Sequence, residues 1–80
     1  MRYHEALRES TNYLNQNYRG RAAREAGRNV GKVGKKEILA DAAKSIEMAM
    51  RAGESLTEAD VHAIVDSLAE SYLEDLNDDE

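Results

Sequence analysis

Apolar residues in the first part of the chain recur every three or four positions, which is the spacing of one face of an α-helix. This face consists of Tyr3, Ala6, Leu7, Tyr13, Leu14 and Tyr18. Tyrosines on such a face bury their rings in the core and place their hydroxyls at its rim. The pattern therefore predicts an amphipathic helix over residues 2–18.

Two further apolar faces follow in the second half of the chain. The first consists of Ile38, Leu39, Ala42, Ile46, Ala49 and Met50, and the second of Val61, Ile64, Val65, Leu68, Tyr72 and Leu76. They predict helices over residues 37–52 and 58–76. Between them, Gly53 is placed to end the first helix and Thr57 to cap the second. We therefore expect these two helices to form an antiparallel αα-hairpin.

Residues 19–36, RGRAAREAGRNVGKVGKK, form a basic segment with seven Lys or Arg, one Glu and four Gly. At about 100° per residue its side chains sort onto three helical faces. The basic face holds Arg21, Arg24, Arg28, Lys32 and Lys35; the apolar face holds Ala22, Ala26, Val30 and Val33; and Gly20, Gly27, Gly31 and Gly34 lie between them. The sorting favours a helix over 21–33 whose glycine strip lets a neighbour approach, with a flexible basic linker as the alternative.

The direction of the apolar face changes at the end of the basic segment. The Ala/Val face points roughly opposite to the face that begins at Ile38. One straight helix cannot bury both faces against a single core. We therefore expect a break or sharp change of direction near residues 34–36.

The composition supports a helical protein of one domain. The chain has 80 residues, no Pro and only 5 Gly, and Ala, Glu, Lys and Arg are abundant. We therefore expect an all-α fold, a small bundle of three to four helices spanning residues 1–80, with a frayed acidic tail at 77–80. Large apolar side chains are few, so the core is small and self-association, for example as a homodimer, would bury additional apolar area.

Charge is distributed very unevenly along the chain. Residues 1–36 hold nine basic and three acidic side chains, a net of +6, and residues 37–80 hold two basic and thirteen acidic ones, a net of −11. These sum to the net charge of −5. Such asymmetry bears on partners and solubility rather than on fold.

Two stretches resemble motifs of catalysis or cofactor binding, but neither matches its motif completely. GRNVGKV at 27–33 has three residues between its glycines and Val33 after Lys32, whereas a phosphate-binding P-loop needs four and a Ser or Thr. HEALR at 4–8 lacks the second histidine of a zinc-protease motif. His62 and Asp66 are spaced to share a helix face with Glu58, an arrangement that exposed helices produce routinely. We expect no enzyme activity, no metal and no cofactor.

The sequence also carries signals of the cellular compartment. The sequence has no Cys, which suits a reducing cytoplasm. It also lacks the long apolar run of a membrane span or signal peptide. We therefore expect a cytoplasmic protein that does not bind membranes.

Binding functions remain, and the first is that of a protein-binding regulator or inhibitor. The predicted last helix presents an acidic face to solvent, which consists of Asp60, Asp66, Glu70 and Glu74. A rigid row of carboxylates can occupy the basic groove of a nucleic-acid-handling protein. Small phage and plasmid accessory proteins with inhibitory roles share this size and acidity, which is an analogy of class only.

Two alternatives use the same charges differently. In the first, the basic face of residues 19–36 binds phosphates of a nucleic acid, for which positive charge at suitable spacing suffices. In the second, the basic and acidic halves pair head to tail between copies in a self-assembling structural protein. The charges could also pair within one molecule, which requires no partner.

Overall fold

The computed structural model describes the backbone of residues 1–78 and the side chains of residues 1–76. Its helices are α1 (Tyr3–Asn17), α2 (Arg21–Glu25), α3 (Gly31–Arg51) and α4 (Glu58–Asp78). The described residues form no strand, and the predicted all-α bundle is confirmed. Helix α4 continues two residues beyond the predicted end at 76, and residues 79–80 of the predicted tail lie outside the described residues.

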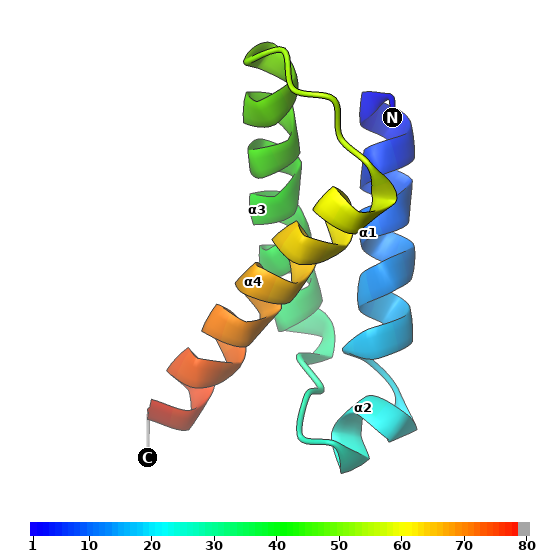
Figure 1. The fold of residues 1–80 in the computed structure, drawn as a ribbon. Coiled ribbons are helices and arrows are strands. Elements are labelled where there is room, and N and C mark those ends of the chain that lie inside the picture. Colours follow the sequence, from blue (N-terminus) through cyan, green and yellow to red (C-terminus); the bar gives the residue numbers. More distant parts are fainter. Residues whose placement is uncertain (79–80) are drawn as a thin grey trace.

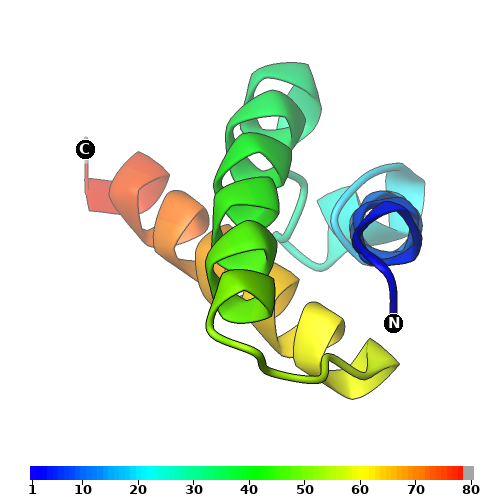
Figure 2. The same ribbon diagram turned by 90° about the horizontal axis from the view of Figure 1, so that it is seen from above.

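The three long helices pack on one another, and α2 lies in the connection from α1 to α3. Helices α1 and α3 run side by side in opposite directions (Figure 1). Helix α4 packs against both and crosses them obliquely, as the view from above also shows (Figure 2). Each long helix therefore turns one face toward the other two and leaves the opposite face exposed.

The core occupies the space enclosed by these three helices and forms two neighbouring clusters. The cluster near α2 contains Leu14, Tyr18, Val30, Ile38, Val65 and Ala69. The cluster near the amino-terminal end of α1 contains Ala6, Ile46, Leu56 and Val61. Most of these residues belong to the predicted apolar faces, because the spacing of three and four residues places them on one side of each helix.

The predicted helix over residues 21–33 is wrong. Helix α2 ends at Glu25, and the chain then turns through Gly27 and Gly31, whose φ angles are 73° and 72°. The backbone N–H groups of Gly27 and Arg28 donate to the carbonyl groups of Arg24 and Ala23, which is the Schellman pattern of a helix end. Left-handed backbone of this kind suits glycine and interrupts a helix.

The predicted break near residues 34–36 is also wrong, because α3 runs without interruption from Gly31 to Arg51. The change of direction occurs earlier, between α2 and α3. The apparent Ala/Val face combined residues of two different helices, and Ala22, Ala26 and Val33 are exposed.

The proposed role of the glycine strip holds at one position only. A Cβ added at Gly34 would lie 2.6 Å from Cε1 of Tyr72 on α4 and 2.8 Å from Cβ of Val30. Gly34 therefore allows α3 and the Tyr72 ring to approach closely, whereas the other three glycines of the segment occupy turns with positive φ.

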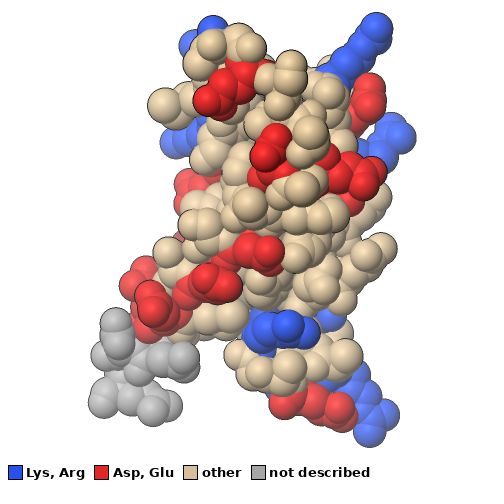
Figure 3. Space-filling view, viewed as in Figure 1, with Lys and Arg blue, Asp and Glu red and all other residues tan. Residues whose placement is uncertain are grey.

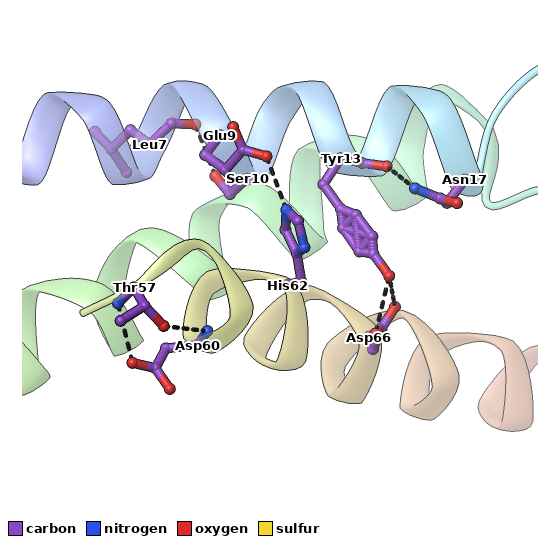
Figure 4. A network of polar contacts seen from close by, with 9 residues as sticks. All are labelled: Leu7, Glu9, Ser10, Tyr13, Asn17, Thr57, Asp60, His62 and Asp66. Carbon is purple, nitrogen blue, oxygen red and sulfur yellow. Dashed lines mark hydrogen bonds and ion pairs between the residues drawn. The ribbon is translucent and has the colours of Figure 1, made fainter. Parts of the chain in front are cut away.

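The connection from α3 to α4 follows the predicted signals. The N–H groups of Gly53 and Glu54 donate to the carbonyl groups of Met50 and Ala49, which ends α3 in a second Schellman pattern. Helix α4 then begins after Thr57, whose Oγ1 accepts a hydrogen bond from the N–H of Asp60 at 3.2 Å. The Asp60 carboxylate in turn accepts from the N–H of Thr57 at 3.0 Å, so the two residues cap the helix reciprocally (Figure 4).

Candidate functional site

Cationic side chains from two separate segments meet where α1 ends and α3 begins. A surface hollow of about 490 Å³ is lined there by Arg19, Lys32, Lys35, Lys36 and Leu39. We call this the basic hollow. Arg19 follows the end of α1, and the other four residues lie in the first turns of α3. The hollow therefore depends on the path of the chain between the two helices.

A backbone hydrogen bond closes that path. The N–H of Val30 donates to the carbonyl oxygen of Tyr18 at 3.0 Å. Tyr18 and Val30 are also buried together in the core, with 6% and 4% of their surface exposed. Because both ends of the connection are held, Arg19 is placed beside Lys32 and its neighbours on α3.

The structure divides the predicted basic face among three elements. Lys32 and Lys35 line the basic hollow, whereas Arg21 and Arg24 lie on α2 and Arg28 lies in the connection that follows. All three arginines are exposed, and Arg21 forms an ion pair with Glu25 at 3.3 Å. A single helical face of five cations therefore does not form.

Arg19, Lys36 and Leu39 also line the hollow but do not belong to the predicted basic face. Arg19 and Lys36 stand at the two ends of the basic segment, and Leu39 belongs to the predicted apolar face of residues 37–52. Turn-forming residues after α2 and at the start of α3, namely Gly27, Asn29 and Gly31, are the signal that could have indicated a reversal of the chain. A reversal brings the two ends of the basic segment together.

The four cations of the hollow are not neutralised within the described molecule. Among the described side chains, ion pairs join Arg21 to Glu25, Arg51 to Glu47, and His62 to Glu9. None of these pairs involves the basic hollow or connects the basic segment to an acid of α4. In the described part of the chain, the two charged halves therefore do not neutralise each other by direct pairing.

Acidic side chains follow a different course over the surface. Figure 3 shows Asp and Glu along the diagonal line of α4, while Lys and Arg project beside α2, where acidic atoms also lie, and at the opposite end of the molecule. Glu70 and Glu74 are exposed, one helical turn apart, as predicted for an acidic face. Asp60 is exposed as well, but its carboxylate takes part in the cap of α4.

The predicted outward position of Asp66 is wrong, because this residue faces α1. Its carboxylate accepts hydrogen bonds from the Tyr13 hydroxyl at 2.9 and 3.0 Å (Figure 4) and from the Tyr18 hydroxyl at 2.6 Å. The residue is half-buried. Asp66 is therefore engaged within the molecule and does not belong to the exposed acidic face of α4.

A neighbouring contact extends this polar cluster along the interface of α1 and α4. Nε2 of His62 lies 2.7 Å from Oε1 of Glu9, and the imidazole ring lies 4.0 Å from the ring of Tyr13, measured between centroids (Figure 4). Burial, followed by the hydrogen bond to Asp66, raises the pKa of both Tyr13 and Tyr18. Phenols with a raised pKa stay protonated and act as hydrogen-bond donors, so the cluster joins two helices and offers no phenolate base.

Other kinds of site receive no support from the described residues. Between residues 1 and 76, His, Asp and Glu side chains nowhere gather in threes as a metal ion would require. None of the helices within residues 1–78 combines the length and the apolar character needed to cross a bilayer. Comparison with protein-family models, curated proteins and solved structures finds no match to this chain.

Proposed function

We propose that this protein is a non-enzymatic binding protein that holds a nucleic acid through its basic end. The carrying observation is the convergence of Arg19, Lys32, Lys35 and Lys36 on one hollow, without an acidic partner among the described side chains. Unpaired cations at one place favour a ligand that bears several phosphates.

The rest of the surface supports an oriented contact. The basic segment contains seven of the eleven Lys and Arg residues, although the whole chain has a net charge of −5. A polyanion that approaches the exposed Glu70 and Glu74 of α4 meets carboxylates, whereas at the basic hollow four cations outnumber the exposed Glu37 that follows Lys36. The uneven field therefore directs a nucleic acid to one end of the molecule.

The binding expected from this arrangement is mainly electrostatic. Lys and Arg that contact phosphates release counterions, so affinity falls steeply as the salt concentration rises. The arginines of α2 and Arg28 extend the positive region beyond the hollow and can contact neighbouring phosphates. The described residues present no long helix whose exposed face is uniformly basic, so we expect little recognition of base sequence.

A charge-reversal pair on α3 tests this proposal. Lys32→Glu combined with Lys36→Glu alters the hollow, and Lys44→Glu combined with Arg51→Glu makes the same change of net charge elsewhere on the helix. Fluorescence anisotropy with labelled DNA and RNA at several salt concentrations measures the effect. We expect the first variant to lose binding, with the slope of log K against log salt reduced in magnitude by about 1 to 2. Equal losses in both variants would overturn the assignment to the hollow.

A protein-binding regulator, of the phage or plasmid accessory type and acting in the cytoplasm, is the second candidate. It is supported by the exposure of Glu70 and Glu74, which have no ion-pair partner among the described side chains. Its face is smaller than the sequence predicts, because Asp66 is engaged with α1. Pull-down from host lysate with nuclease treatment, repeated with Glu70→Lys and Glu74→Lys together, tests it. Capture that is unaffected by this reversal would rule out the acidic face.

Self-assembly through the opposite charges of the two halves is tested by its dependence on salt. Pairing of the basic end of one copy with the acidic α4 of another predicts an oligomer that dissociates as the salt concentration rises. Sedimentation equilibrium at low and high ionic strength measures this directly. A mass of one chain at all salt concentrations would exclude this assembly.

A further inference from the structure

The basic hollow is not merely a cluster of charges. Leu39 contributes an apolar wall, and it also packs against the core cluster that contains Leu14 and Ile38. Arg19 and Lys35 are half-buried, while Lys32 and Lys36 are exposed. Lysine and arginine side chains line a cavity with their aliphatic stems and keep their charged ends in water. The hollow therefore combines an apolar interior with a cationic rim.

We propose that the basic hollow receives one unpaired nucleobase while its cations hold the adjacent phosphates, so that the protein prefers single-stranded nucleic acid. This inference rests on the proposed nucleic-acid binding and specifies the form of nucleic acid that is bound. It assigns two roles within the hollow. Leu39 contacts the base, and the guanidinium group of Arg19 stacks on it.

The side chains that line the hollow support a nucleobase as the occupant. The hollow has a volume of about 490 Å³ and is bounded by five side chains from two chain segments. The face of a nucleobase can lie against the apolar Leu39, and a planar guanidinium is a suitable stacking partner where no aromatic side chain lines the hollow. A ligand that consists of phosphate alone would bind the cations but would make no apolar contact with Leu39.

A double helix cannot use the hollow in the same way. Its bases are stacked and paired, so its outer surface offers phosphates to the rim but no free base to the interior. Single strands offer both, and stacking on protein groups adds to affinity with little regard to sequence. Contact with Leu39 therefore favours binding of single strands over duplexes, whereas the cations attract both.

Three ligands of equal length separate these contributions. They are an oligothymidylate of about eight nucleotides, a chain of abasic sugar phosphates of the same length, and a duplex of the same length. We expect the oligothymidylate to bind roughly tenfold more tightly than the abasic chain, because only the former supplies a base. We expect the duplex to bind with an affinity close to that of the abasic chain.

Two substitutions connect this preference to the hollow. Leu39→Ala removes the apolar wall, and Arg19→Lys keeps the charge but removes the planar group. Each should reduce the preference for the oligothymidylate over the abasic chain, while abasic binding changes little. Val33→Ala, at an exposed position on the same helix that does not line the hollow, is the matched control. Leu39 also packs against the core, so Leu39→Ala could unfold the protein. In that case Arg19→Lys still tests the proposal.

The outcomes distinguish this inference from the function on which it rests. Equal binding of all three ligands overturns the base-binding role and leaves nucleic-acid binding in place. Binding of none of them overturns both proposals. Binding to vesicles that contain anionic phospholipid, without binding to any oligonucleotide, also overturns both and assigns the hollow to a lipid headgroup.

Discussion

The hydroxyl of Tyr18 donates a hydrogen bond of 2.6 Å to Oδ1 of Asp66, and this contact joins the end of α1 to the middle of α4. The carbonyl oxygen of the same tyrosine accepts from the N–H of Val30, immediately before α3. One residue thus connects all three long helices near the basic hollow. Its side chain bonds to Asp66 and its backbone carbonyl group to Val30, so a substitution of the side chain tests the first contact without removing the second.

Tyr18→Phe should destabilise the protein by about 1–2 kcal/mol, because a hydrogen bond to a carboxylate is lost while the ring stays in the core. Asp66 keeps the Tyr13 hydroxyl as a donor, which limits the effect. Urea unfolding measures the change. Tyr3→Phe is the control, since the described structure shows no hydrogen bond from the half-buried Tyr3 hydroxyl. Equal effects of the two substitutions would contradict the role of the Asp66 contact.

Stability should decline at alkaline pH. The folded protein raises the pKa of Tyr13 and Tyr18 above the ordinary value of about 10, chiefly through burial. Their contribution is therefore complete below about pH 10 and is lost above it, where the unfolded chain releases protons that the folded chain retains. Urea unfolding between about pH 8 and about pH 12 follows this loss.

The alkaline decline can be separated from the titration of lysines by a double variant. Tyr13→Phe combined with Tyr18→Phe keeps every lysine but removes both phenols, so its stability should change less with pH than that of the parent. An identical alkaline decline in parent and variant would show that the phenols are not its cause.

Gly34→Ala should destabilise α3, although alanine normally stabilises a helix by about 1 kcal/mol relative to glycine. The added Cβ would lie 2.6 Å from the Tyr72 ring, so the ring or α4 must shift, at a cost of about 1–3 kcal/mol. The unfolding free energy of Gly34→Ala, Tyr72→Leu and the double variant measures the coupling.

The exposed Ala40 on α3 provides the comparison. Ala40→Gly should cost about 1 kcal/mol, as expected from helix propensity alone. If Gly34→Ala instead stabilises the protein by a similar amount, the close contact with Tyr72 is not present in solution.

Thr57→Ala should cost about 1 kcal/mol, because the N–H of Asp60 loses its side-chain acceptor at the start of α4. Thr57→Ser keeps the hydroxyl and should retain most of the stability. Thermal unfolding monitored by circular dichroism compares the two variants. A Ser variant as unstable as the Ala variant would assign the effect to the lost methyl group rather than to the cap.

Local signals predicted most of the fold correctly. Gly53 and Thr57 mark a helix end and a helix start, and both features depend on bonds between residues only a few positions apart. The apolar spacing placed Leu14, Ile46 and Val65 in the core for the same reason. The all-α class follows from such short-range preferences, repeated along the chain.

The wrong predictions concern features that depend on contacts between residues far apart in the sequence. Spacing alone cannot distinguish a helical glycine from one with positive φ, so Gly27 and Gly31 were placed inside a helix. Asp66 has the spacing of an exposed residue, but it faces inward to accept hydrogen bonds from Tyr13 and Tyr18, which are distant in the sequence. The basic hollow needs Arg19 beside Lys36, a proximity that exists only after the chain has reversed.

The hydrogen bond between Tyr18 and Val30 has a consequence for how this chain can change. It closes a loop of residues 19–29 whose two ends are adjacent, and within that loop Ala23 is buried with 2% of its surface exposed. Changes of charge at the exposed Arg21, Arg24 and Arg28 would leave this buried contact and the core in place. The protein is thus a helical scaffold on which the charge beside the basic hollow can change, while four of the five residues that line the hollow stay fixed on α3.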